Sequence, residues 1–197
     1  RDKFGNLILT QTRKSSKKPV FITAHLDHPA FVVRKQIDDQ HLEMEFRGGV
    51  NDAYFVGAKV EVFDNDDNGY IGTIQSLEAK AKPFKRVVVK LKKGVAGILL
   101  KDDIARWKFN PPVVKNGLLH APACDDLAGV AAALCALDTI KKLSALGHVG
   151  VLLTRAEEIG FVGAIAAAKN KSVPKTSRLL CLETSRSFPE SPIGGGP

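Results

Sequence analysis

The alternation of helix-like and strand-like segments after residue 118 is the feature of this sequence that most constrains its fold. Apolar residues recur there first at helical and then at strand spacing. Strands that alternate with helices form a parallel sheet, because each helix carries the chain back to the start of the next strand. Asp126 is expected to cap the first helix. The predicted order is helix, strand, helix, strand, over residues 126–146, 149–154, 164–168 and 179–182.

A continuous apolar run earlier in the chain belongs to the same pattern. Residues 20–24 have the composition of a parallel strand that is buried on both faces. A basic loop separates this run from a short opening strand over residues 6–10, and His25 and Asp27 follow the run directly. The expected fold class is therefore α/β, with a parallel sheet.

The segment from about Arg34 to Leu118 has a different pattern. Short β-like runs alternate with turns rich in glycine, proline, asparagine and aspartate, and no helical period of useful length occurs. We expect a small β-barrel or sandwich inserted into the α/β domain, so that residues 1–33 and 119–197 form one domain and residues 34–118 another. The strand-like runs cover residues 42–46, 58–62, 70–74 and 86–91.

Composition excludes several classes of protein. Hydrophobic residues make up 44% and charged residues 25% of the 197-residue chain, values typical of globular domains and unlike those of disordered, collagen-like or coiled-coil chains. No run of 18 apolar residues occurs, and the start of the sequence lacks the apolar stretch of a signal peptide. The three cysteines show no Cys-x-x-Cys spacing, which argues against a disulfide framework or a thiolate zinc site. We therefore expect a cytoplasmic protein with no membrane segment.

The net charge of +8 makes a nucleic-acid-binding β-barrel an alternative. A barrel that binds single strands needs aromatic rings between its basic residues for base stacking, and only Phe84 lies within the basic run of this chain. Lysines that protect an exposed sheet edge against strand addition explain the run better. We therefore expect no nucleic-acid partner. The basic run comprises Lys80, Lys82, Lys85, Arg86, Lys90, Lys92 and Lys93.

Five acidic or imidazole residues lie near predicted strand ends or at the start of a predicted helix, where parallel α/β sheets bind their ligands. They are His25, Asp125, Glu157, Glu158 and Glu183. Each alone has a structural explanation, such as a helix cap. Together they supply a two-metal hydrolytic site short of one ligand, with a bridging carboxylate, terminal ligands and a free carboxylate base. Asp27 is a supporting catalytic residue, because its carboxylate can accept the second imidazole N–H of His25.

Four segments around these residues carry a family resemblance. In order and spacing they resemble the metal-binding motifs of the glutamyl-aminopeptidase and tetrahedral-aminopeptidase (cellulase M-like) family of co-catalytic metallopeptidases. The resemblance spans nearly the whole chain and implies a catalytic α/β domain that a small β-barrel interrupts between the first two motifs. The segments are AHLD at 24–27, ACDDLAGV at 123–130, AEEIGFVGA at 156–164 and LETS at 182–185.

The resemblance also implies a role for each site residue. His25 would bind one metal, and Asp125 would bridge two. Glu158 and Glu183 would be further ligands, and Glu157 would be the general base. The metals would be two divalent ions, zinc or cobalt in many family members, with manganese as a third option. The family commonly has Asp where Glu183 stands, and its final histidine ligand lies downstream of the residues present here.

The function implied by the resemblance is metal-dependent removal of N-terminal residues from peptides. Hydrolysis of acyl-amino acids or other amides by the same kind of site is an alternative. Residues 34–118 would help dimers assemble into a homo-oligomer, typically of twelve subunits. A strand begins almost at once after residue 1, and the glycine-rich segment 193–197 leads to no further element, so we expect a chain truncated at both ends.

Overall fold

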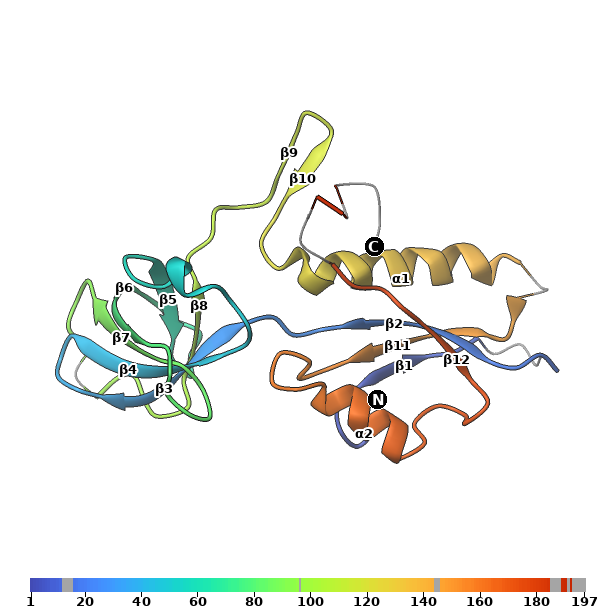
Figure 1. The fold of residues 1–197 in the computed structure, drawn as a ribbon, viewed down its shortest axis with the longest axis horizontal. Coiled ribbons are helices and arrows are strands. Elements are labelled where there is room, and N and C mark those ends of the chain that lie inside the picture. Colours follow the sequence, from blue (N-terminus) through green and yellow to red (C-terminus); the bar gives the residue numbers. More distant parts are fainter. Residues whose placement is uncertain (12–15, 96, 144–145, 185–188, 191, 193–197) are drawn as a thin grey trace. The chain divides into compact units, whose positions relative to one another are not determined.

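The computed structural model describes residues 1–11, 16–95, 97–143, 146–184, 189, 190 and 192 (Figure 1). The chain divides into two compact units. The α/β unit comprises Arg1–Asp27 and Ala123–Pro197, and the barrel unit comprises His28–Pro122. The glycine-rich segment 193–197 that suggested a truncated end lies outside the described residues.

The α/β unit is built on a four-stranded sheet with the order β1-β11-β2-β12. Both β11 and β12 run parallel to β2, which confirms the predicted parallel sheet, whereas β1 pairs antiparallel with β11. All six residues of β11 are buried, as expected for a strand with neighbours on both sides and both faces covered. The strands are β1 (Leu7–Leu9), β2 (Val20–His25), β11 (Val149–Thr154) and β12 (Arg178–Cys181).

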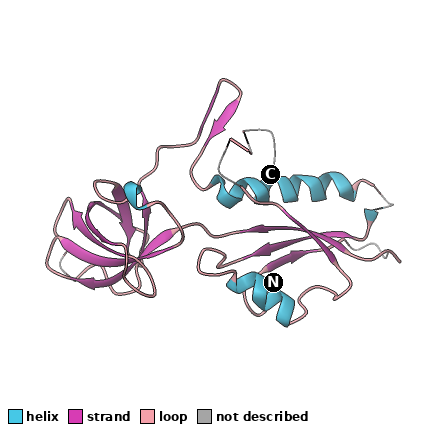
Figure 2. Ribbon diagram, in the orientation of Figure 1, coloured by secondary structure: helices cyan, strands magenta, loops and turns pink. Residues whose placement is uncertain are grey.

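The two helices of this unit, α1 (Cys124–Lys141) and α2 (Val162–Lys169), cover opposite faces of the sheet (Figures 1 and 2). Side chains on β2 point alternately to the two faces. Ile22 therefore packs in the cluster that includes residues of α1, and Phe21 packs with Ala167 of α2. Helix α1 ends earlier than predicted, because the chain continues in tighter turns such as that closed by the bond from Leu143 N–H to the Ile140 carbonyl (2.8 Å).

The barrel unit confirms the predicted β-barrel. Six strands close in the order β3-β4-β7-β6-β5-β8. The first of them begins at Ala30, before the expected limit at Arg34, because alternate residues of this strand fill the barrel interior. A single-turn helix, η1 (Asp52–Tyr54), lies between β4 (His41–Arg47) and β5 (Lys59–Phe63). The strands are β3 (Ala30–Gln36), β4 (His41–Arg47), β5 (Lys59–Phe63), β6 (Gly69–Glu78), β7 (Arg86–Leu91) and β8 (Ile104–Trp107).

Aromatic rings fill the barrel core. Phe31 and Phe46 have ring centroids 5.1 Å apart, and Phe46 lies edge-on to Phe55 at 4.9 Å, while Trp107 contacts all three rings. Edge-to-face geometry adds a favourable quadrupole term to the burial of these large apolar surfaces. The core is independent of the α/β unit, since its buried cluster contains residues of the barrel unit only.

A hairpin that the sequence analysis did not predict follows the barrel strands. Its strands β9 (Val113–Lys115) and β10 (Leu118–His120) pair antiparallel, and all six residues are exposed. Asn116 and Gly117 connect the strands with positive φ values of 52° and 75°, the backbone of a type I′ turn. Among the described residues, no helix is both long and apolar enough to cross a membrane.

Candidate metal centre

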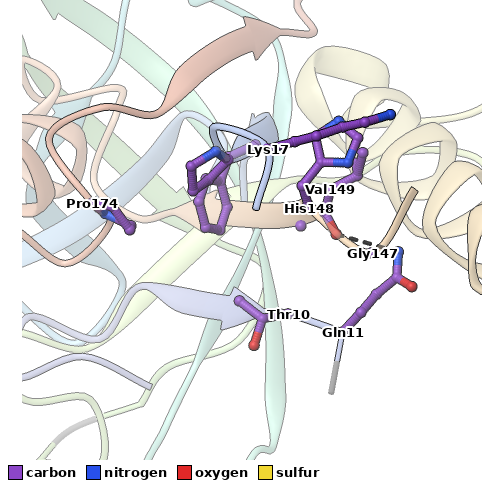
Figure 3. Close-up of a pocket in the computed structure, with 10 residues that line it drawn as sticks. Thr10, Gln11, Lys17, Gly147, His148, Val149 and Pro174 are labelled. Carbon is purple, nitrogen blue, oxygen red and sulfur yellow. Dashed lines mark hydrogen bonds between the residues drawn. The ribbon is translucent and has the colours of Figure 1, made fainter. Parts of the chain in front are cut away.

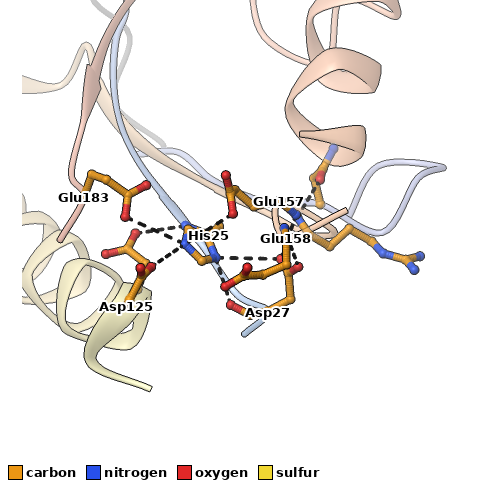
Figure 4. A network of polar contacts seen from close by, with 9 residues as sticks. His25, Asp27, Asp125, Glu157, Glu158 and Glu183 are labelled. Atoms are coloured by element: carbon orange, nitrogen blue, oxygen red, sulfur yellow. Dashed lines mark hydrogen bonds and ion pairs between the residues drawn. The ribbon is translucent and has the colours of Figure 1, made fainter. Parts of the chain in front are cut away.

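The ends of three parallel strands bring the candidate residues together. His25 is the last residue of β2, and Glu157 and Glu158 follow the end of β11. Glu183 follows β12, and Asp125 lies at the start of α1. All of them belong to the α/β unit. Since the strands are parallel, their carboxyl ends meet at one edge of the sheet, and the side chains converge there (Figure 4).

The imidazole of His25 is the centre of the group. Its side chain is only 4% exposed, and its Nε2 atom lies 2.9 Å from Asp125 Oδ1. The same nitrogen is 3.9 Å from carboxylate oxygens of Glu157 and Glu183. The other ring nitrogen, Nδ1, is 2.8 Å from the backbone carbonyl oxygen of Asp27. An N–H on Nδ1 donating to this carbonyl leaves the Nε2 lone pair directed at the carboxylates, as metal binding requires.

Asp27 supports the site in a different way from the one predicted. Its carboxylate lies 3.8 Å from His25 Nδ1, so the backbone carbonyl takes the imidazole contact instead. Both carboxylate oxygens accept bonds from the loop after β11: Oδ1 from Glu157 N–H (3.0 Å) and Oδ2 from Glu158 N–H (3.2 Å). Asp27 therefore ties the end of β2 to the backbone that carries two of the candidate carboxylates.

The protonation equilibria show how crowded the carboxylates are. Burial, followed by repulsion from Glu157 and Asp125, raises the pKa of Glu158 to about 7. Burial also raises the pKa of Glu183, with a further contribution from the charge of Asp125. Burial lowers the pKa of His25, but the hydrogen bond to Asp125 and the charge of Glu157 outweigh it and leave this pKa raised. Negative charge thus exceeds the positive charge available to balance it.

Two sets of potential metal ligands occur among the described residues. Ligand atoms of His25, Asp125 and Glu158 lie within 4.8 Å of one another, and so do those of His25, Asp126 and Glu183. Imidazole nitrogen and carboxylate oxygen are suitable ligands for zinc, cobalt and manganese. The donor chemistry and the excess negative charge both fit divalent cations. Asp126 is the residue that the sequence analysis missed as part of the site.

Comparison with protein families decides the relationship of this chain to known proteins. The family model described as M42 glutamyl aminopeptidase matches residues 5–182. The chain belongs to this family. A comparison with curated proteins found no match.

Several solved structures share the fold at low sequence identity. An aminopeptidase from the archaeon Desulfurococcus kamchatkensis has a TM-score of 0.75 and 22% identity, over 95% of this chain and 53% of that one. The TET1 peptidase of Pyrococcus horikoshii has a TM-score of 0.66 and 20% identity, over 92% and 57%. A TET aminopeptidase from a marine sediment archaeon has a TM-score of 0.70 and 18% identity, over 93% and 54%. The chain therefore spans about half the length of the structures it matches.

A cleft of about 300 Å³ opens beside the candidate ligands of this M42 family member. His25, Glu157 and Glu183 line one part of it, and apolar side chains such as Leu152 and Phe161 line the rest. The carboxylates thus stand at the border of an apolar hollow on the α2 face of the sheet.

A second hollow lies at the other end of the same strands (Figure 3). It has a volume of about 230 Å³ and is lined by residues that include Lys17, His148 and Pro174. Val149, at the start of β11, also lines it, so it adjoins the amino ends of the parallel strands. No Asp or Glu is among its described lining residues, and the acidic group therefore belongs to the carboxyl-end site alone.

Proposed function

We propose that the whole protein is a metal-dependent aminopeptidase with a two-metal site. The observation that carries this proposal is the convergence of His25 with carboxylates from three other segments of the chain, in a member of the M42 family. Its candidate metals are zinc and cobalt, with manganese as a further option, and its proposed location is the cytoplasm.

The proposed ligands are His25, Asp125, Glu158 and Glu183. The family resemblance implies that Asp125 is the bridging ligand, and its Oδ1 lies 2.9 Å from His25 Nε2. Divalent cations bound here would polarise the scissile carbonyl and acidify a bound water. The protein itself positions the ligands. Asp27 holds the backbone of Glu157 and Glu158, and His25 is held at the end of β2.

Glu157 is the proposed general base. Its carboxylate belongs to neither ligand set, yet it lines the cleft and reaches to 3.9 Å from His25 Nε2. From this position it accepts a proton from the attacking water and later delivers it to the departing amine. The bond from Glu157 N–H to Asp27 fixes the backbone that aims this side chain.

Peptides are the proposed substrates and further copies of the chain the proposed partners. The P. horikoshii TET1 peptidase is described as assembling into a tetrahedron or a large octahedral shell. We propose that the barrel unit, which contains the whole segment 34–118, joins dimers into a comparable dodecamer. A closed assembly of this kind would admit only peptides that pass its openings.

The decisive experiment measures turnover and metal content of the whole protein together. Glu157→Gln is expected to reduce peptide turnover by about 10²- to 10⁴-fold and to leave metal content unchanged, because a proton-transfer group does not hold the ions. The matched variant Glu158→Gln is expected to lose metal as well as turnover. Assays on free aminoacyl and N-acylated substrates with zinc, cobalt and manganese separate an aminopeptidase from a deacylase. Equal metal loss in the two variants would contradict the assignment of the base.

A further inference from the structure

Asp126 is the most deeply buried acidic side chain of the candidate site. The residue has no exposed surface, whereas the side chains of its neighbour Asp125 and of Glu183 are 56% and 52% exposed. Burial raises the pKa of Asp126, which reflects the cost of placing a carboxylate away from water. A side chain kept there despite this cost needs a structural or chemical reason.

One end of the Asp126 carboxylate holds the backbone of His25. Oδ2 accepts the N–H of His25 at 3.1 Å, and this bond is buried. The backbone N–H and carbonyl groups of alternate residues along β2 point towards β12. The bonds from Arg178 N–H to the Pro19 carbonyl and from Leu182 N–H to the Thr23 carbonyl show this alternation. His25 is the next residue in this alternation, but the pairing with β12 ends at Cys181 opposite Thr23. Asp126 therefore supplies the acceptor that β12 no longer provides.

The other end of the carboxylate lies against the first regular turn of α1. The backbone of Asp125 and Asp126 is not helical, so regular helix begins at Leu127, and Asp126 stands where the sequence predicted the cap. A Cβ atom at Gly129 would lie 2.2 Å from Asp126 Oδ1 and 2.8 Å from its Cγ. Only glycine lets this turn approach the carboxylate so closely.

We propose that Asp126 is a positioning residue for the metal site. It joins the end of β2 to the start of α1, and thereby sets the separation between the His25 imidazole and the Asp125 carboxylate. Adjacent residues hold His25 from two sides: Asp125 contacts its ring at 2.9 Å, and Asp126 contacts its backbone N–H. The proposal rests on the proposed function only in assuming that His25 and Asp125 bind metal.

A competing role for Asp126 is direct metal binding, because its carboxylate belongs to the ligand set with His25 and Glu183. The two roles make different demands on the side chain. An acceptor for the His25 N–H needs an oxygen but no charge, and asparagine supplies one with nearly the same shape. A metal ligand of this kind needs the charged carboxylate.

The test compares Asp126→Asn, Asp126→Ala and Gly129→Ala in the whole protein, with Asp125→Asn as the ligand control. The first measurement is amide hydrogen exchange at His25 without metal. Asp126→Asn is expected to keep this exchange within about threefold of the parent chain. Asp126→Ala and Gly129→Ala are expected to speed it at least tenfold, the first by removing the acceptor and the second by displacing it.

The second measurement is zinc affinity by calorimetry. Asp126→Ala and Gly129→Ala are expected to weaken zinc binding about 10- to 100-fold, the usual effect of removing a group that orients a ligand, whereas Asp126→Asn is expected to restore most of the affinity. Loss of affinity in Asp126→Asn equal to that in Asp125→Asn would overturn the proposal in favour of a ligand role. Unchanged His25 exchange in Asp126→Ala would also overturn it. If the whole parent protein binds no zinc, the proposed function fails, and the exchange measurement still decides whether Asp126 positions His25.

Discussion

The two units of this chain differ in whether their main sheet is closed or has edges. In the barrel unit the six-stranded sheet closes on itself, so each of its strands has a neighbour on both sides, and the apolar residues of its core cluster are buried. In the α/β unit the described sheet ends at β12, where Leu179 and Leu180 are each 54% exposed. By contrast, every residue of β11, which lies two strands away from β12 in the same sheet, is buried.

The barrel unit contains a closed apolar core, whereas the candidate metal site lies in the α/β unit. The barrel core is complete within the barrel unit, and none of the candidate ligands belongs to that unit. The α/β unit gathers around His25 a group of carboxylates that repel one another. We therefore expect the barrel unit to be the more stable of the two and the α/β unit to respond more strongly to cations and pH.

The largest expected effect is on the barrel core. Phe31→Ala removes a fully buried ring that contacts Phe46, Phe55 and Trp107, and is expected to lower the free energy of unfolding of the barrel unit by about 3–5 kcal/mol. Urea unfolding followed by Trp107 fluorescence reports on this unit, since Trp107 is the chain's one tryptophan. Far-ultraviolet circular dichroism follows the helices of the α/β unit. A parallel loss in the helical signal would show that the two units unfold together and contradict the separation.

Two leucines on either side of β2 give the next largest contrast. Leu152 in β11 is 3% exposed and Leu180 in β12 is 54% exposed, so the residue type is constant while the burial differs. Leu152→Ala is expected to destabilise the α/β unit by about 2–5 kcal/mol, and Leu180→Ala by less than about 1 kcal/mol. Thermal unfolding of both variants measures the difference. Equal destabilisation would mean that β12 is covered in solution.

Much of the fold follows from local pattern, and the exceptions have physical causes. Strands buried on both faces, such as β2 and β11, have continuous apolar runs that can be recognised without tertiary information. Strand β8 has only four residues, Ile104–Trp107, and its pairing with β3 and β5 across the barrel defines it. The exposed β9–β10 hairpin has no buried face, but its Asn116-Gly117 turn was a usable indication.

The site was predictable to the extent that it depends on strand ends. His25 is the last residue of one parallel strand and Glu183 follows another, and the topology alone brings them together. The partners of the Asp27 carboxylate are backbone amides 130 and 131 residues away in the chain, which no side-chain pattern can indicate. The role of Asp126 depends on where the pairing of β12 ends, and the sequence therefore suggested only a helix cap.

A change of pH is expected to have a smaller effect on the free energy of unfolding, with opposite sign for the two units. In the metal-free α/β unit the pKa of Glu158 is raised from 4.5 to about 7, and that of His25 is raised above 6.5. Both groups bind protons more strongly when folded, so stability falls as pH rises: from about 4.5 to 7 for Glu158, and through the raised pKa for His25. In the barrel unit, bonds from Lys108 and Arg106 hold the pKa of Glu61 below its usual value, and stability is lost as pH falls through it.

Urea midpoints of the two units at pH 5 and pH 8, in the presence of a chelator, measure this contrast. After allowance for solvent screening of half-buried Glu158, the α/β unit is expected to lose about 1–2 kcal/mol between the two values. Added zinc should reverse the loss at pH 8, because a cation replaces the protons that balance the carboxylates. An α/β unit that gains stability from pH 5 to pH 8 without metal would contradict the crowding described here.

The smallest expected effect concerns the outer surface of the barrel. Glu61 on β5 contacts Lys108 Nζ at 2.7 Å and Arg106 at 3.1 Å, and its side chain is 14% exposed. Glu61→Gln is expected to lower the stability of the barrel unit by about 1 kcal/mol or less at low salt, and by less still at 1 M salt, because exposed cations are screened. Glu78→Gln is the matched control, since this 64% exposed side chain lies 3.9 Å from Arg86 and should contribute almost nothing. A loss at Glu61 comparable to that of Phe31→Ala would show that surface charge, and not the closed aromatic core, stabilises the barrel.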